Sequence, residues 1–395
     1  GSGDERAVGI YAPGRVNLEI EAEDVRRLRD ALTAWLDAPR DAARADLVAL
    51  LVALSILFIW HYFLYFSTTH FFGINSKPAR RLLALLYALL PAGFFASEIL
   101  ERRIQNDASR AMATAFTLWL GVGLGLLLAF LAAWIGWGIA QWHNPRPAKI
   151  YFGVAALLFA GAYSAYGVWN ARHPRLKELD IAIRDLPAAW QSRRVILISD
   201  LHLGATLGRS FLESVVSQIN LQAPEAVFIT GDLFDGVDGD LDDLAAPLGK
   251  IKAPRGVYYV TGNHEGFMGV ERARAAVAKT QVRFLDDEVV MVDGLQIVGL
   301  NYARNGFSRD LAAALAGLNG FNPKLPSILL YHSPGQEEAV KAAGIRLQLS
   351  GHTHYGQLFP MNLITRLVYG KYYRGLHVED DFAIYTSPGA GFWGP

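Results

Sequence analysis

The chain has 395 residues, balances 37 Lys and Arg against 37 Asp and Glu, is 52% apolar and contains no cysteine. This length indicates two or more domains, and the neutral balance gives no support for a protein that binds nucleic acid. The lack of cysteine excludes disulfides, thiolate zinc sites and cysteine nucleophiles, so any chemistry must come from histidine and carboxylate side chains.

Long apolar segments gather between residues 47 and 170 and predict four membrane-spanning helices. Leu47–Phe66 is 20 residues without a formal charge, and at about 1.5 Å per residue it matches the hydrocarbon thickness of a bilayer. Leu82–Leu100 and Ile150–Asn170 are two further candidates. Ala111–Trp142 runs for 32 uncharged residues, too few for two crossings with a turn, and predicts one long tilted or protruding helix.

The distribution of Lys and Arg around these spans predicts their orientation. One side would carry twelve of these residues and the other five. The richer side holds both flanks of the four spans, so we expect both ends of the chain in the cytoplasm. The expected organisation is a cytoplasmic segment over residues 1–46 with a surface helix over Asp24–Leu47, a transmembrane domain over 47–172 and a globular domain over 173–395. His61 lies within the first span, where its role is open between function and structure.

After about residue 176 the pattern changes to short apolar runs, each followed by polar residues and several by a helix-like stretch. The runs predict strands that are buried on both faces of an α/β sheet. They are Val195–Ser199, Ala226–Thr230, Val257–Thr261, Ile328–Tyr331 and Leu347–Ser350. Val289–Leu300, centred on Asp293-Gly294, predicts a β-hairpin.

Each of the five runs ends in a polar cluster, at the edge where ligand sites form in α/β sheets. The clusters are Asp200-Leu201-His202, Gly231-Asp232-Leu233-Phe234-Asp235, Gly262-Asn263-His264-Glu265, His332, and Gly351-His352-Thr353-His354. Their glycines would let the backbone turn sharply where the side chains converge. Mixed imidazole and carboxylate ligands suit Mn, Fe or Zn.

Charge then indicates the reaction. Two divalent ions carry four positive charges, of which the carboxylates of Asp200 and Asp232 neutralise two, so the centre would attract a phosphate oxyanion. A metal pair about 3.5–4 Å apart stabilises in-line displacement at phosphorus and generates hydroxide from water. The sequence therefore predicts hydrolysis of a phosphate ester or anhydride.

These residues resemble the calcineurin-like metallophosphoesterase superfamily, whose D-x-H, G-D-x-x-D, G-N-H-[DE], later His and G-H-x-H motifs occur here in order. The resemblance covers about residues 177–395 and implies a four-layer sandwich of two β-sheets flanked by helices. The closing Gly391-Phe392-Trp393-Gly394-Pro395 is similar to the bacterial membrane-associated YaeI and YkuE type branch, in which the chain usually continues into one more strand.

The resemblance also implies residue roles. Asp200, His202 and His354 would bind the first metal ion, and Asn263, His332 and His352 the second, with Asp232 bridging them. His264 would act as general acid or transition-state donor, oriented by the side-chain carboxylate of Asp235. The resemblance leaves the role of Glu265 undefined.

The four spans favour a membrane lipid or lipid-linked precursor as the substrate, with a phosphodiester or pyrophosphate bond to be cleaved. Some members of the superfamily cleave UDP-diacylglucosamine, which makes it a candidate. Residues Met361–Leu376 mix apolar, aromatic and basic side chains and suit either the headgroup boundary of a bilayer or a hairpin that covers the sheet edge. Two alternatives remain open: a broad phosphodiesterase for soluble esters that is merely tethered, and a transporter or scaffold with a metal-stabilised regulatory domain. The sequence gives no oligomeric state.

Overall fold

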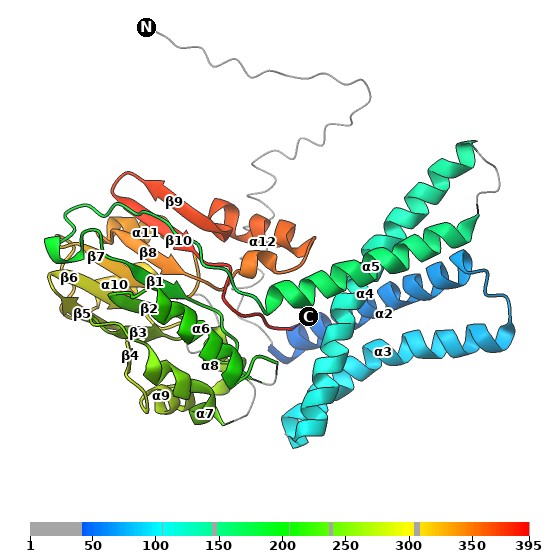
Figure 1. The fold of residues 1–395 in the computed structure, drawn as a ribbon, viewed down its shortest axis with the longest axis horizontal. Coiled ribbons are helices and arrows are strands. Elements are labelled where there is room, and N and C mark those ends of the chain that lie inside the picture. The colour runs from blue at the N-terminus through cyan, green and yellow to red at the C-terminus, as the bar shows by residue number, and fades with distance from the viewer. Residues whose placement is uncertain are drawn as a thin grey trace, which may run out of the picture. The chain divides into compact units, whose positions relative to one another are not determined.

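The computed structural model describes residues 42–104, 106–143, 148–204, 206–236, 240–303 and 309–394. Of the surface helix expected over Asp24–Leu47, residues 24–41 lie outside these ranges. The described chain begins with four long helices (Figure 1), which are α2 (Ala42–Phe71), α3 (Lys77–Ile104), α4 (Asp107–His143) and α5 (Lys149–Ala171). All four are long and apolar enough to cross a membrane. The structure thus confirms a long helix at each of the four predicted spans, including the single long third one.

Side chains of α2, α4 and α5 share one apolar cluster, in which Leu64, Phe71 and Phe130 are buried. His61 is buried beside this cluster, and both of its ring nitrogens have partners. Its Nδ1 lies 2.8 Å from the Leu57 carbonyl oxygen, and its Nε2 accepts a hydrogen bond of 3.0 Å from the Trp119 indole. A buried imidazole with a hydrogen-bond partner for each ring nitrogen favours the structural alternative.

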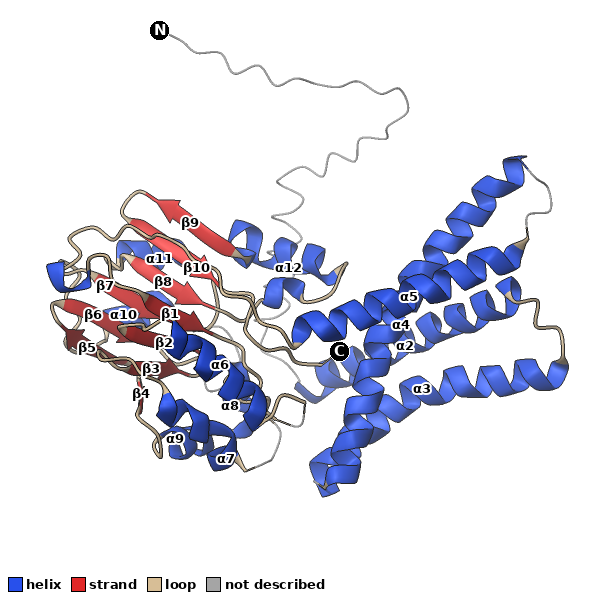
Figure 2. Ribbon diagram, viewed as in Figure 1, coloured by secondary structure: helices blue, strands red, loops and turns tan. Residues whose placement is uncertain are grey.

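The globular part contains two β-sheets, coloured red in Figure 2. The first has the order β1-β2-β3-β4 and is parallel throughout, with β1 (Val195–Ile198), β2 (Ala226–Thr230), β3 (Val257–Val260) and β4 (Val282–Phe284). The second has the order β5-β6-β7-β8-β10-β9, with β5 (Glu288–Val292), β6 (Leu295–Gly299), β7 (Ser327–Leu330), β8 (Leu347–Ser350), β9 (Gly375–Glu379) and β10 (Phe382–Thr386). Its outer pairs β5/β6 and β9/β10 are antiparallel, and its inner pairs are parallel.

The helices of this part are short. They are α6 (Arg209–Leu221), α7 (Leu241–Ala245), α8 (Asn263–Met268), α9 (Val270–Val277), α10 (Leu311–Ala316), α11 (Glu337–Ala342) and α12 (Met361–Tyr369). Single 3₁₀ turns lie at η1 (Ala188–Trp190), η2 (Ala246–Lys250), η3 (His354–Gly356) and η4 (Gly370–Tyr373).

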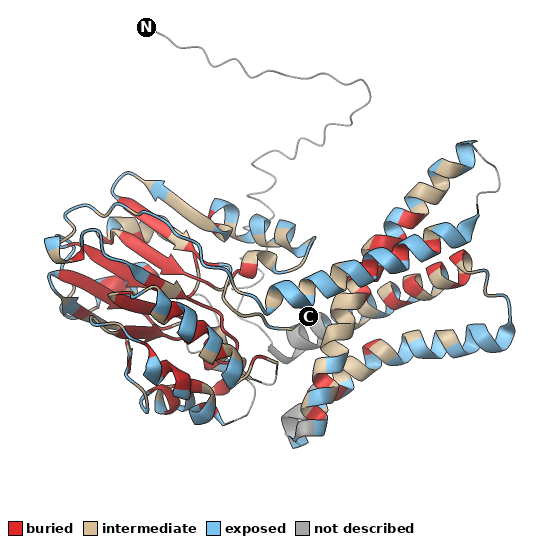
Figure 3. Cartoon of the chain, viewed as in Figure 1, coloured by how far each residue is buried: buried red, intermediate tan, exposed pale blue. Residues whose placement is uncertain are grey.

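Three apolar cores hold four layers together. Successive side chains of a strand point to opposite faces of its sheet and therefore belong to different cores. Val227 and Ile229 of β2 pack against α6, α7 and α9, whereas Phe228 points into the core between the sheets. In β7, Ile328 faces the same inter-sheet core and Leu329 packs against α10 and α11. The strands are accordingly mostly buried in Figure 3. This arrangement confirms the expected sandwich of two sheets flanked by helices.

The segment Met361–Leu376 does not form the hairpin considered as one alternative. It is the helix α12, followed by η4 and by the first residues of the edge strand β9. The hairpin at this edge is instead β9–β10, which starts at Gly375. The predicted hairpin around Asp293-Gly294 is present as β5–β6.

Candidate metal centre

The carboxyl ends of β1, β2 and β3 from one sheet meet those of β7 and β8 from the other. Main-chain hydrogen bonds join the loops that follow these strands. The amide of Asp200 donates to the Gly231 carbonyl at 3.0 Å, and that of Gly351 donates to the His332 carbonyl at 2.8 Å. The amide of His352 donates to the Asp200 carboxylate at 2.9 Å, which links the two sheets directly. Side chains that lie up to 154 positions apart in the chain are thereby collected at one edge.

The backbone at this edge is strained at the polar residues themselves. Five of them adopt left-handed φ angles, namely Asp200 (53°), His202 (47°), Asp232 (49°), His352 (72°) and His354 (48°). Such a conformation costs on the order of 1–3 kcal/mol for a residue with a side chain and persists only where the surroundings enforce it. Strain of this kind gathers at functional sites.

Two glycines act here through their small size. A Cβ atom on Gly262 would collide with the Asp232 carboxylate, and one on Gly351 would collide with that of Asp200. The φ angle of Gly262 is −105°, which any residue can adopt. The sharp turn expected from the sequence is therefore not the reason for glycine at position 262, where close approach of two loops requires it.

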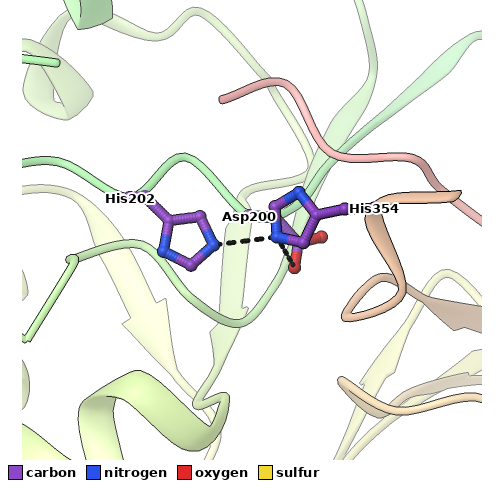
Figure 4. A group of neighbouring side chains, drawn as sticks. All are labelled: Asp200, His202 and His354. Carbon is purple, nitrogen blue, oxygen red and sulfur yellow. Dashed lines mark hydrogen bonds and ion pairs between the residues drawn. The ribbon is translucent and has the colours of Figure 1, made fainter. Parts of the chain in front are cut away.

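A first group of possible ligand atoms comes from Asp200, His202 and His354 (Figure 4), which are all buried. The Nε2 atoms of the two histidines lie 3.0 Å apart, and Nε2 of His354 lies 3.5 Å from Oδ1 of Asp200. Both imidazoles therefore direct a nitrogen toward the same small volume. Oδ2 of Asp200 is buried and accepts no hydrogen bond from the described residues, as expected of an oxygen that a cation would contact.

A second group comes from Asp232, His332 and His352. Nε2 of His332 lies 3.1 Å from Oδ2 of Asp232, 3.1 Å from Oδ1 of Asn263 and 3.1 Å from Nδ1 of His352. The same Asp232 oxygen lies 3.8 Å from Nε2 of His202 in the first group. Asp232 thus stands between the two groups, where a carboxylate can bridge two cations.

The electrostatics of the groups fit metal binding. Burial lowers the pKa of His202 and of His352 to about 3, so these imidazoles stay neutral and keep a lone pair for a cation. At His332 burial also acts to lower the pKa, but the neighbouring carboxylate of Asp232 outweighs it and raises the pKa to about 9. The field that favours a proton on His332 favours a metal cation at the same place. The donor set of imidazole, carboxylate and amide suits Mn, Fe or Zn.

His264 and Asp235 lie beside the two groups. The ring of His264 stands edge-on to that of His202, with 4.5 Å between centroids. Its Nδ1 lies 3.0 Å from the main-chain oxygen of Asp235 and 3.6 Å from the carboxylate. That carboxylate is nearer to Nδ1 of His202, at 3.2 Å, and burial raises its pKa to about 7. The main chain of Asp235 thus makes the contact with His264 that the sequence analysis assigned to its side chain.

Glu265 has a role that the sequence analysis did not find. Its carboxylate is completely buried and accepts three main-chain hydrogen bonds. Oε2 receives the amides of Asp232 at 3.0 Å and Gly262 at 2.7 Å, and Oε1 receives that of Phe234 at 3.0 Å. Glu265 therefore clamps the loops that carry Asp232, Asn263 and His264. A Glu at the third position of a helix commonly accepts the amide of the residue just before the helix. The position of Glu265 three residues after Gly262 was therefore a sequence signal for this role.

Aromatic side chains surround the centre, and of these only Trp393 belongs to a motif noted in the sequence. Tyr302 contacts the rings of both His332 and His352, at centroid distances of 5.7 and 5.8 Å. On the other side, the half-exposed Trp393 and the exposed Phe267 lie 6.0 and 5.9 Å from the ring of His264. These aromatic side chains form an apolar rim around the metal centre.

Comparison with known proteins agrees with this geometry. The Calcineurin-like phosphoesterase family profile matches residues 193–356. A "Transmembrane protein with metallophosphoesterase domain" from Danio rerio is 34% identical over 261 residues, 61% of this chain and 58% of that protein. An uncharacterised metallophosphoesterase of Aquifex aeolicus is 32% identical, and the match covers 61% of this chain and 92% of that protein. For the metallophosphoesterase YkuE of Bacillus subtilis the identity is 30%, with coverage of 60% and 88%.

The fold and the buried His and Asp groups are those of a metallophosphoesterase domain. With a similar protein matched over nine tenths of its length, the chain belongs to the calcineurin-like phosphoesterase family. Its four candidate spans make it a membrane protein. The chain covers little more than half the length of the Danio rerio relative.

Proposed function

We propose that the protein hydrolyses a phosphodiester or pyrophosphate bond of a membrane lipid or lipid-linked precursor at a dinuclear metal centre. The observation that supports this most strongly is the position of Asp232 between the two ligand groups, with Oδ2 at 3.1 Å from His332 and 3.8 Å from His202, in a chain that also carries four candidate spans. We assign Asp200, His202 and His354 to one ion, and Asn263, His332 and His352 to the other, with Asp232 between them.

When bound, two divalent ions would supply positive charge for the phosphate oxygens and lower the pKa of a water molecule. The side chains of the protein have separate tasks. Glu265 holds the loop amides, so that Asp232 stays between the two ligand groups. The carboxylates of Asp200 and Asp232 would neutralise only two of the four positive charges of these ions. The centre would therefore attract a phosphate.

His264 is our candidate for the general acid. Its Nδ1, at 3.0 Å from the main-chain oxygen of Asp235, must carry a proton to make this hydrogen bond. When the ring is protonated on both nitrogens, Nε2 is the one that can give its proton to the departing oxygen of the substrate. Asp235 positions this ring through its main chain and faces His202 with its carboxylate.

We further propose the division of the chain at residues 46 and 172, with the hydrolase part in the cytoplasm and the spans in a bacterial inner membrane. The excess of Lys and Arg on one side of the spans supports the orientation, and the similar proteins of Aquifex aeolicus and Bacillus subtilis support a bacterial source and the YaeI/YkuE type branch. The relative from the animal Danio rerio is also named as a transmembrane protein with a metallophosphoesterase domain.

The test is a phosphorus-resolved product analysis. The full chain in detergent with Mn²⁺ is incubated with extracted bacterial lipids, UDP-diacylglucosamine and the soluble ester bis-p-nitrophenyl phosphate, each with and without a chelator. Release of a chelator-sensitive product from a lipid phosphate is the expected result. Turnover of the soluble ester with no product from any lipid would contradict the lipid substrate and leave the tethered broad phosphodiesterase.

A further inference from the structure

The helix α12 presents its apolar side chains outward and its polar side chains to the protein. Asn362, Thr365 and Tyr369 lie on one face, and all three are partly buried. On the opposite face Leu363, Ile364 and Leu367 are 52%, 51% and 46% exposed, and no residue of the helix is buried. A helix on the surface of a water-soluble domain normally has the reverse pattern. Figure 3 shows the exposed turns of α12 in pale blue.

Three neighbouring residues enlarge this outward face. Met361 and Val368, which are 45% and 37% exposed, flank this face, and Phe359, just before the helix, is 55% exposed. We call the set of Phe359, Met361, Leu363, Ile364, Leu367 and Val368 the α12 face. A run of apolar side chains of this size on one helix marks an interaction site.

The inward face connects α12 to the metal centre. The ring of Tyr369 lies 5.9 Å from that of His352, and its hydroxyl is hydrogen-bonded to Ser333, which follows the possible ligand His332. Burial raises the pKa of Tyr369 to about 12, so the hydroxyl stays neutral. At its other end α12 begins seven residues after His354, with Asn362 packed on Gly356. Whatever binds the α12 face is thereby held at the edge of the centre.

Charge indicates what binds there. Arg366 is exposed within the helix, and Arg374 is exposed just beyond it. The guanidinium of Arg374 stacks on the rings of Tyr355 and Tyr373, whereas Lys371 is paired with Glu379 and adds no free charge. Apolar side chains flanked by arginine and tyrosine match the boundary between lipid headgroups and acyl chains, where the phosphates lie. Residues 172–180 link the last candidate span to Ile181, which packs on the inter-sheet core, so such a boundary lies within reach of the globular part.

We propose that the α12 face lies in the headgroup boundary of the bilayer that holds the spans, with Arg366 and Arg374 at anionic lipid phosphates. This inference rests on the proposed function, because it explains how a lipid phosphate reaches the metal centre. The aromatic rim of Phe267 and Trp393 lies beside His264 of the same centre, where it suits the apolar part of such a substrate.

The lack of cysteine in the chain allows a direct test. Leu363→Cys is labelled with an environment-sensitive fluorophore in the full chain, reconstituted in nanodiscs of phosphatidylcholine and phosphatidylglycerol with and without nitroxide-labelled lipid. The matched control is Leu221→Cys. Leu221 is the last residue of α6 and is 79% exposed. We expect the nitroxide to quench the label at position 363 and to leave that at position 221 unchanged. Equal quenching at both positions, or protection of position 363 from both lipid and aqueous quenchers, would overturn the proposal, the latter by showing a protein partner on this face.

A second variant tests the charge. Arg366→Gln in the Leu363→Cys chain should reduce the quenching in discs that contain phosphatidylglycerol and leave it unchanged in discs of phosphatidylcholine alone. Unchanged quenching in both would remove Arg366 from the contact with anionic lipid.

The same samples separate this inference from the proposed function. Hydrolysis of bis-p-nitrophenyl phosphate with Mn²⁺ requires the metal centre and no contact with lipid. Quenching without hydrolysis would support the docking of the α12 face and contradict the enzymatic function. Hydrolysis without quenching would support the enzymatic function and contradict the docking.

Discussion

Replacing Glu265 by Gln tests the clamp that this residue forms behind the metal centre. The exchange keeps the volume of the side chain but leaves one acceptor oxygen in place of two. If that oxygen takes the position of Oε2, the amides of Asp232 and Gly262 stay paired, and the amide of Phe234 then faces the new NH₂ group. At least one buried donor therefore loses its acceptor.

The magnitude follows from the contacts. A hydrogen bond to a charged group contributes about 1.5–3 kcal/mol, and a buried donor without an acceptor costs about 1–3 kcal/mol. Burial and the nearby Asp232 carboxylate raise the pKa of Glu265, so removing its charge also relieves a repulsion that offsets part of this loss. We expect a net loss of about 1–3 kcal/mol, which lowers the Tm of a domain of this size by about 2–12 °C. Because Asp232 is displaced, metal affinity should fall about 10-fold to 100-fold.

The assay follows thermal unfolding of the metal-free full chain in detergent by tryptophan fluorescence, and Mn²⁺ binding by titration. Glu271→Gln is the matched control, because it makes the same exchange on the neighbouring helix α9 at a side chain that is 76% exposed. A Glu265→Gln protein with the Tm and Mn²⁺ affinity of the control would refute the clamp.

Three further predictions concern single residues. His264→Ala should retain its metal content, measured by mass spectrometry, while turnover of bis-p-nitrophenyl phosphate falls about 10²-fold or more if this imidazole is the acid; unchanged turnover would remove it from the mechanism. Asp235→Asn should weaken Mn²⁺ binding about 10-fold or more, since its carboxylate faces His202; normal binding with slow turnover would show that it acts only through His264. Trp119→Phe should lower the stability of the spans by at least about 0.6 kcal/mol and leave turnover unchanged, because it removes the hydrogen bond to His61 and part of the packing of the indole ring. The exposed Trp142→Phe is its control.

The sequence predicted those parts of the protein that have a regular local pattern. The four spans were visible because a helix in lipid must be apolar over its whole length. The five strands were visible because strands buried on both faces read as unbroken apolar runs. Polar residues directly after such strands reach the same edge of a sheet, so the sequence also indicated which side chains could meet.

Other parts depend on contacts that a sequence does not display. The partners of Glu265 are main-chain amides. Because every residue except proline has one, the sequence does not mark which amides it binds. The left-handed backbone at Asp200 and His354 is imposed by the surrounding loops. The rim of Phe267 and Trp393 joins segments 126 positions apart. For α12 a signal was present, because Leu363, Ile364, Leu367 and Val368 repeat with helical spacing, but the aromatic residues beyond them also suited a strand.

The central claim is that the side chains at this edge hold two metal ions side by side. The most direct measurement is electron paramagnetic resonance of the full chain loaded with Mn²⁺, together with the metal content per chain. The account predicts two Mn²⁺ per chain with an exchange-coupled spectrum, as for ions about 3.5–4 Å apart, and loss of the coupling in Asp232→Ala. A single uncoupled Mn²⁺ per chain, or a coupled pair that survives this substitution, would contradict it.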